Sequence, residues 1–250
     1  MKRFLIVNAD DCNLTAGVTR AILECHDRGI VSSTTFLVNL PVDKSTVRQL
    51  TKRRRLGIGI HLNITLGQPV LPQKRVRSLV ETTGCFIRQG AKRPRAADVT
   101  REWEAQLRRF FRIFGRKPTH LDTHHQLHDQ PFYFNLLARL ARKWKLPVRR
   151  SRILKGKRMP GLCSPDYFFG DLDPAGYWRP KQLKAVLRRL PEGVSEIMCH
   201  PGKLDRELRQ ISSFTRGREE EYRLFASKQL RAWLQKQDIH LGNFKRCVFF

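Results

Sequence analysis

Residues 4–11 read FLIVNADD, a short apolar run that closes on two adjacent aspartates. An apolar, β-branched run of this length favours a buried strand, and the polar residues after it mark the carboxyl end of that strand. A helical pattern follows at once, with apolar side chains at helical spacing after Thr15 and with Gly29 at its end. Repetition of this order along the chain predicts βαβ units, and therefore an α/β fold with a largely parallel sheet.

The remaining elements follow the same alternation, in what we expect to be one domain over residues 1–250. This length allows a large β/α domain with a sizeable core. Predicted strands cover residues 33–38, 56–62, 119–124 and 194–200, and predicted helices cover residues 97–114, 132–144, 181–190 and 219–237. A long excursion rich in proline, glycine and basic residues spans 67–97, and long loops of this kind often serve as lids or substrate walls.

The charge balance is strongly basic, with 49 Lys and Arg against 22 Asp and Glu and a formal net charge of +27. Basic clusters at 52–55, 149–152 and 155–158 are expected to form a solvated, arginine-rich surface. The alternative is a site for an anionic ligand. The six cysteines are scattered without a C-x-x-C pair, which favours a cytoplasmic protein over a disulfide framework or a zinc ribbon. Because no window of about 18 apolar residues occurs, we expect no membrane segment.

Residues 118–128 read PTHLDTHHQLH and hold four of the chain's eight histidines together with Asp122. The fragments NADD at 8–11 and GIHLN at 59–63 carry the same types of residue. Neutral imidazole and carboxylate are ligands of divalent metals that act as Lewis acids. All three fragments fall where predicted strands end, which is where β/α enzymes place their chemistry. The sequence therefore predicts a metal-dependent hydrolase.

The two adjacent aspartates can divide the chemistry between them. At the end of a strand the backbone turns, so Asp10 and Asp11 can both reach one pocket. One of them would bind the metal while the other accepts a proton from metal-bound water. The alternative is that one of them only caps the following helix. His61 ends a glycine-rich strand and is either a ligand or a hydrogen-bonded core histidine.

The histidine cluster also leaves alternatives open. His124 and His128 are spaced i,i+4 and His125 and His128 i,i+3, so on a helix either pair could share a metal. The strand pattern before them argues against a helix. Asp122 could orient an imidazole by accepting its free N–H. His200, at a strand end before a Pro-Gly pair, is either the group that protonates a leaving amine or a surface histidine.

Five motifs stand in order along nearly the whole chain. They are NADD at 8–11, GIGIHL at 57–62, GRKPTHLDTHH at 115–125, HPG at 200–202 and REEE at 218–221. Together they resemble the YdjC-like carbohydrate deacetylases, a family that includes the chitooligosaccharide deacetylases. The resemblance implies a single-domain distorted β/α barrel of the TIM-like type. It also implies removal of an N-acetyl group from an amino sugar or chitooligosaccharide, with release of acetate. One divalent metal ion is implied, usually Mg²⁺, with Zn²⁺ or Mn²⁺ as alternatives.

The expected residue roles fall into three groups, of which the resemblance implies the first two. The metal ligands would be Asp11, His61 and His125. The catalytic residues would be Asp10 as general base and His200 as an acid or a partner of the oxyanion. Residues behind the ligands or in contact with substrate would be Asp122, His124 and Asn63.

Two positions depart from the family pattern. Cys12-Asn13 stands where the family usually has Phe-Gly, and Gln126 stands where a third consecutive histidine is common. Neither change removes an implied ligand, but both could alter the fit of a substrate near the metal. The family pattern does not explain the high positive charge.

Other functions fit parts of the sequence. A metal-dependent phosphoesterase would use the same histidines and aspartates, and the basic surface would attract its substrate. A basic nucleic-acid-binding protein on a retired enzyme scaffold would bind with steep salt dependence. The partners we expect are an acetylated amino sugar and, through the basic surface, an anionic ligand. A homodimer is left open.

Overall fold

The computed structural model describes residues 2–157, 160–170 and 176–247. Within these ranges the strands form one sheet, made of β1 (Arg3–Cys12), β2 (Ser33–Phe36), β3 (Gly57–Leu62), β4 (Leu121–Thr123), β5 (Tyr167–Phe169), β6 (Gly193–Cys199) and β7 (Ile239–Gly242). The order across the sheet is β4-β3-β2-β1-β6-β5, and β7 pairs with the first half of β1. Every pairing is parallel, which confirms the predicted α/β class.

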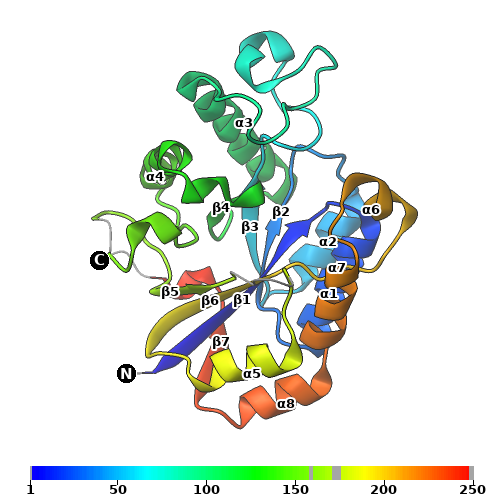
Figure 1. Ribbon diagram of the computed structural model, residues 1–250, viewed down its shortest axis with the longest axis vertical. Coiled ribbons are helices and arrows are strands. Elements are labelled where there is room, and N and C mark those ends of the chain that lie inside the picture. The colour runs from blue at the N-terminus through cyan, green and yellow to red at the C-terminus, as the bar shows by residue number, and fades with distance from the viewer. Residues whose placement is uncertain (1, 158–159, 171–175, 248–250) are drawn as a thin grey trace.

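The helices lie around the outside of the curved sheet (Figure 1). They are α1 (Ala16–Arg28), α2 (Lys44–Lys52), α3 (Ala96–Phe114), α4 (Pro131–Trp144), α5 (Pro180–Arg188), α6 (Arg206–Ile211), α7 (Arg216–Phe225) and α8 (Lys228–Gln235). In Figure 1, α1, α2, α6 and α7 stand on one side of the strands, and α5 and α8 lie below them. Strands inside and helices outside make a distorted, TIM-like β/α barrel, as predicted.

Local sequence explains where these elements begin and end. The Thr15 hydroxyl accepts a hydrogen bond from the backbone N–H of Val18 and so caps the start of α1. Gly115 ends α3 in the left-handed region with φ of 65°, which glycine adopts without steric cost. The strands β2 and β3 are buried along their whole length, as expected for parallel strands that are covered on both faces.

An irregular segment continues the barrel wall beyond β4. Leu121 bridges to Val148 in parallel, and the backbone N–H of Val148 donates to the carbonyl of Cys163. The backbone N–H of Arg149 then donates to the carbonyl of Leu121. This segment therefore occupies the place of a further strand, and Arg149 enters the interior of the barrel from it.

Three predicted elements differ from the structure. The helix predicted over 219–237 is two helices, α7 and α8, because Ser227 caps a new start by accepting from the N–H of Leu230. The strand predicted over 119–124 is confined to β4, and a 3-10 turn (His124–Asp129) follows it. The excursion after β3 forms short 3-10 turns and a Val80–Phe86 bridge. No helix within the described ranges is long and apolar enough to cross a membrane.

Candidate active site

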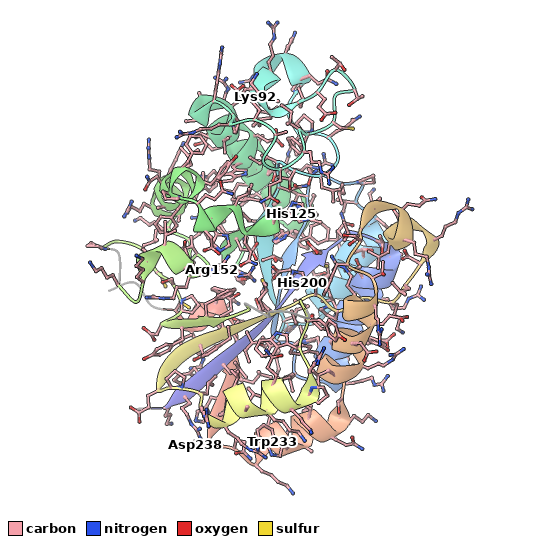
Figure 2. All side chains as sticks on the ribbon, in the orientation of Figure 1. Lys92, His125, Arg152, His200, Trp233 and Asp238 are labelled. Atoms are coloured by element: carbon pink, nitrogen blue, oxygen red, sulfur yellow. The ribbon has the colours of Figure 1, made fainter. Side chains whose placement is uncertain are left out.

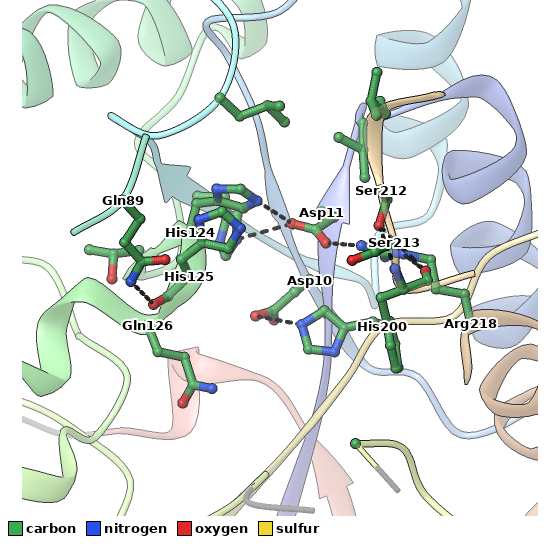
Figure 3. A pocket seen from close by; sticks show the side chains of 17 residues that line it. Asp10, Asp11, Gln89, His124, His125, Gln126, His200, Ser212, Ser213 and Arg218 are labelled. Carbon is green, nitrogen blue, oxygen red and sulfur yellow. Dashed lines mark hydrogen bonds and ion pairs between the residues drawn. The ribbon is translucent and has the colours of Figure 1, made fainter. Parts of the chain in front are cut away.

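The carboxyl ends of β1, β3, β4 and β6 open onto one cavity of about 430 Å³ (Figure 3). The ionisable side chains that line it are Asp10, Asp11, His61, His124, His125, His200 and Arg218. In Figure 2, His125 and His200 lie near the centre of the molecule, and Arg152, from the basic cluster at 149–152, lies to the left of His200. Side chains from distant parts of the chain thus meet at one site, as the predicted strand ends require.

The backbone at the end of β1 turns both aspartates into this cavity. In a regular strand, neighbouring side chains point to opposite faces. Asp11 instead has a φ of 64°, and the register between β1 and β2 shifts between Ala9 and Cys12. Such a bulge re-aims a side chain. Asp10 and Asp11 therefore face the same space although they are adjacent.

Asp11 presents one carboxylate oxygen to two imidazole rings. Its Oδ1 lies 3.2 Å from His61 Nε2 and 3.8 Å from His124 Nε2, without a hydrogen bond of good geometry. Its Oδ2 accepts a 2.6 Å hydrogen bond from Nη2 of Arg218. Burial by itself would raise the pKa of Asp11, but the charge of Arg218 together with His61 and His124 outweighs burial and holds that pKa well below its usual range. The carboxylate is therefore charged.

The other nitrogen of each ring is held by a separate partner. His61 Nδ1 lies 2.6 Å from Asp122 Oδ1, so the carboxylate accepts the ring N–H and leaves Nε2 toward Asp11. His124 Nδ1 lies 2.8 Å from the hydroxyl of Thr65. Burial lowers the pKa of His124 to about 3, which keeps this ring neutral at neutral pH. Both rings are thus oriented from behind.

These residues fit a divalent cation. The bare Oδ1 of Asp11 and the two Nε2 atoms that face it are the mixed oxygen and nitrogen donors that such ions take. Burial alone would lower the pKa of His61, but the carboxylates of Asp122 and Asp11 raise it to about 10. The two carboxylates stabilise the positive charge of a proton on His61. They would equally stabilise a metal cation that replaces this proton.

His125 lies on the same cavity wall but is more exposed than His124. Its backbone adopts a φ of 54°, and its ring centroid is 3.8 Å from that of His124. Burial lowers the pKa of His125 as well, so its ring is available in the neutral form. In the structure, His124 faces Asp11 together with His61. His125, which we predict as a ligand, lies next to His124.

Asp10 is in a different environment, because a buried arginine binds both of its oxygens. Arg149 Nη1 donates to Oδ2 over 2.6 Å and Nη2 donates to Oδ1 over 2.7 Å. The same guanidinium donates through Nε to Glu196 over 2.8 Å, and its Nη1 lies 3.1 Å from Asp122 Oδ2. We predict a solvated surface for the basic cluster at 149–152, and this is wrong for Arg149, which is fully buried, and for Arg150, which is 8% exposed.

A second group of potential ligands is formed by Asp10, His61 and Asp122, whose donor atoms lie within 4.8 Å of one another. Arg149 Nη1 already contacts both carboxylates of this group. A cation placed there would meet the guanidinium charge at close range. Arg218 binds only the other oxygen of Asp11, Oδ2, and leaves Oδ1 bare, so the space beside Oδ1 is the better position for a metal ion.

His200 follows β6 and lies on the Asp10 side of the cavity (Figure 3). Its Nε2 is 3.9 Å from Asp10 Oδ2. Burial lowers the pKa of His200, although the charge of Asp10 opposes this, so the ring is neutral at neutral pH. Its backbone N–H donates to Glu221, which also accepts from the N–H of Trp178. Glu221 thus fixes the chain around His200.

Asn63 lies apart from the cavity lining. Its Oδ1 accepts hydrogen bonds from the backbone N–H groups of Thr65 and Leu66, and its Nδ2 donates to the carbonyl of Leu66. Asn63 therefore shapes the turn that carries Thr65, whose hydroxyl meets His124. Its contact with the site runs through that turn.

Comparison with known proteins places the chain in a family. The model of the "YdjC-like protein" family matches residues 4–236. The chain belongs to the YdjC-like family. The resemblance of the motifs is thereby confirmed.

Similar YdjC-like proteins cover the chain from end to end. A "Carbohydrate deacetylase" of Geobacillus stearothermophilus is 35% identical over 98% of both chains. A "Chitooligosaccharide deacetylase" of Proteus mirabilis is 32% identical over 99% of this chain and 100% of its own.

Solved structures share the fold. A crystal structure from Enterococcus faecalis V583, of a protein described as a candidate for cellobiose-phosphate cleavage, has a TM-score of 0.88 at 32% identity over 98% of both chains. A family 4 acetyl xylan esterase from Clostridium thermocellum in complex with cobalt has a TM-score of 0.53 at 11% identity, covering 97% of this chain and 89% of its own. The esterase is similar in fold alone.

The two departures from the YdjC-like pattern have structural explanations. Asn13 has a φ of 74°, which asparagine tolerates better than most residues and which suits the glycine that the family usually has there. Its side-chain amide donates to the carbonyls of Leu37 and Pro41. Cys12 is fully buried and does not line the cavity, whereas Gln126 does. Of the two departures, Gln126 is therefore the one in reach of a ligand.

Sequence reasoning missed the charged residues that surround the aspartates. Arg149 lies in a basic cluster, and nothing in that pattern distinguishes a buried arginine from solvated ones. Glu196 stands within a predicted strand, and its place in the otherwise mostly apolar segment 194–199 is a weak sign of an inward-facing charge. Arg218 belongs to the REEE motif at 218–221, which is the signal by which it could have been found.

Proposed function

We propose that this YdjC-like protein is a metal-dependent carbohydrate N-deacetylase. It removes the N-acetyl group of an amino sugar or chitooligosaccharide and releases acetate. The observation that carries the proposal is the pair of adjacent aspartates in one cavity, one with a bare oxygen facing two imidazoles and one next to His200. The names of the relatives support the substrate class.

The metal would be held by Asp11, His61 and the neighbouring rings of His124 and His125. We propose Mg²⁺ as the ion, with Zn²⁺ or Mn²⁺ as alternatives. When bound, a divalent ion supplies a Lewis acid for the acyl carbonyl and makes water easier to deprotonate. Asp122 contacts Nδ1 of His61 and Thr65 contacts Nδ1 of His124, so both rings would present Nε2 to the ion.

Asp10 would act as the general base. As a water oxygen adds to the acyl carbon, one of its protons passes to the Asp10 carboxylate. Arg149 and the amide of Asn8, which donates to Oδ1 over 2.8 Å, keep that carboxylate in place. A positioned base of this kind contributes about 10²–10⁴ to the rate.

His200 would complete the proton transfer. The carbon–nitrogen bond breaks only when the leaving amine gains a proton. Because His200 is neutral at the outset and its Nε2 lies 3.9 Å from Asp10, the ring can take up the proton that Asp10 received and pass it to the amine. Water, proton and leaving group then balance, with acetate and a free amino sugar as products.

Acetate release tests the proposal. The protein is stripped of metal, reloaded with Mg²⁺, Zn²⁺ or Mn²⁺, and incubated with diacetylchitobiose and a panel of N-acetylated monosaccharides. We expect metal-restored release that is lost in His61→Ala and kept in the matched control His240→Ala, whose side chain is 46% exposed on β7. Absence of release from every sugar, together with hydrolysis of p-nitrophenyl phosphate, would favour the phosphoesterase instead.

The other expectations about partners and location stay predictions. An anionic ligand on the basic surface, a homodimer and a cytoplasmic location each require separate measurement. The salt dependence of polyanion binding and the mass in solution are the direct tests of the first two.

A further inference from the structure

Arg218 is a buried arginine at the start of α7 that is held rigidly beside Asp11. Its side chain is 6% exposed. Nη2 donates to Asp11 Oδ2 over 2.6 Å, and Nε donates to the carbonyl of Phe214 over 3.1 Å. A side chain added at Gly202 would meet Cβ and Cδ of Arg218 at 3.2 Å, so this glycine leaves room for the stem. The guanidinium therefore has one fixed orientation.

One nitrogen of this guanidinium has no partner in the described part of the chain. Nη1 of Arg218 is buried and makes no hydrogen bond, while the side chain lines the cavity with Asp10, Asp11 and His200. Arg149 offers the contrast, because all three of its nitrogens donate to carboxylates. Buried donors in folded proteins nearly always have partners, so an orphaned one at a cavity points to a ligand.

We propose that Nη1 of Arg218 donates a hydrogen bond to the acyl oxygen of the bound N-acetyl group. This inference rests on the proposed deacetylase function and adds a substrate-contacting residue to it. The acyl oxygen gains negative charge when water adds to the carbonyl carbon, and the same atom becomes a carboxylate oxygen of acetate. A fixed cationic donor stabilises both species.

The surrounding charges select this oxygen as the acceptor. Asp10, on the other side of the cavity, is a carboxylate and would repel an oxyanion, whereas it attracts the proton of the attacking water. Arg218 lies on the opposite side, paired with Asp11, and lines the cavity with a cationic group. The acyl oxygen is therefore directed toward Arg218 and the attacking water toward Asp10.

Two variants of Arg218 test the contact, with Arg223→Ala as the matched control because Arg223 lies on the same helix and is 63% exposed. Arg218→Lys keeps a positive charge near Asp11 but loses the planar fork, and Arg218→Ala removes both. The measurements are kcat and KM for diacetylchitobiose, inhibition by acetate, and Mn²⁺ affinity by calorimetry. Activity of Arg218→Ala is also measured with added guanidinium at millimolar concentration.

We expect both variants to lose about 10²–10³ in kcat, as for removal of one oxyanion donor. Acetate should inhibit them more weakly than the wild type, Mn²⁺ affinity should not fall, and guanidinium should restore part of the activity of Arg218→Ala. Retained Mn²⁺ binding by Arg218→Lys shows that the fold is intact.

Two results would overturn the inference. One is a kcat close to the wild-type value in Arg218→Lys and Arg218→Ala. The other is a loss of activity that excess Mn²⁺ reverses, since Arg218 would then only support Asp11 as a ligand. An inactive wild-type protein would instead refute the deacetylase proposal itself, so the two failures are distinguishable.

Discussion

Asp10 and Asp11 are adjacent in the chain and each binds a buried arginine, yet they are left with different free atoms. Arg149 meets Asp10 with both terminal nitrogens, so both oxygens are occupied. Arg218 meets Asp11 with one nitrogen, so Asp11 keeps a bare Oδ1 and Arg218 keeps a bare Nη1. The difference teaches that the geometry of the guanidinium, more than its charge, decides which carboxylate can bind a ligand.

The two arginines also differ in what surrounds them. Arg149 has Asp10, Asp122 and Glu196 around it and no exposed surface. Burial raises the pKa of Glu196 to about 7, although Arg149 opposes the shift. Arg218 has a single carboxylate partner and borders the open cavity. We infer that Arg149 serves to hold Asp10 in place as the base, and that the Asp11 side serves to bind the metal ion and the substrate.

The largest effect is expected from Asp10→Asn, which breaks the base and spares the metal side. Turnover of diacetylchitobiose should fall by about 10²–10⁴, the usual contribution of a positioned base. The measurement is kcat at saturating metal. A variant that turns over as fast as the wild type would show that Asp10 does not accept the proton.

Arg149→Met tests whether Arg149 stabilises the fold on the Asp10 side of the site. It leaves three buried carboxylates without their common counter-ion, and breaking a buried ion pair costs about 3–5 kcal/mol. Urea unfolding followed by circular dichroism gives the free energy of unfolding. Arg223→Met, at a 63% exposed position, is the control and should change little. A loss as small as that of the control would contradict the holding role of Arg149.

Thr65→Val tests whether His124 is a metal ligand on the Asp11 side of the site. The change removes the hydroxyl that lies 2.8 Å from His124 Nδ1, and loss of such an orienting partner costs about 10–100-fold in metal affinity. Thr65→Ser keeps the hydroxyl and should bind Mn²⁺ close to wild type. Equal affinity of Thr65→Val and the wild type would mean that His124 is not a ligand.

The pH dependence of metal binding should follow His61. Its pKa in the folded protein is raised to about 10 from the ordinary histidine value of 6.5, because Asp122 and Asp11 outweigh the effect of burial. The protonated ring therefore stabilises the metal-free fold fully below pH 6.5, and this contribution is lost as the pH rises through about 10.

A metal ion that binds His61 must displace the same proton. The affinity for the metal should therefore rise about tenfold per pH unit between pH 6.5 and pH 10. Calorimetry in buffers of different ionisation enthalpy should detect about one proton released per ion at pH 7. Affinity independent of pH would contradict this.

The parts of the site that follow from strand order could be predicted from the sequence. Parallel strands end at one edge, so Asp10, Asp11, His61 and His200 had to come together. The helix break at Ser227 could not be inferred, because apolar spacing continues across it and only the cap interrupts the helix.

The inner charges could be predicted least. Arg149 reads as part of a basic surface cluster, and only the segment that continues the barrel wall after β4 carries it inside. His124 rather than His125 faces Asp11 because the backbone makes a left-handed turn at His125 and Gln126. Neither residue is one that marks such a turn in a sequence, since glycine and asparagine are the usual signals.

The most direct test of the comparison is Mn²⁺ binding by calorimetry to Asp10→Asn and Asp11→Asn at pH 7. We predict that Asp10→Asn binds one ion with nearly wild-type affinity and that Asp11→Asn binds none. The reverse result, with binding lost in Asp10→Asn and kept in Asp11→Asn, would place the ion among Asp10, His61 and Asp122 and contradict the division of roles between the two aspartates.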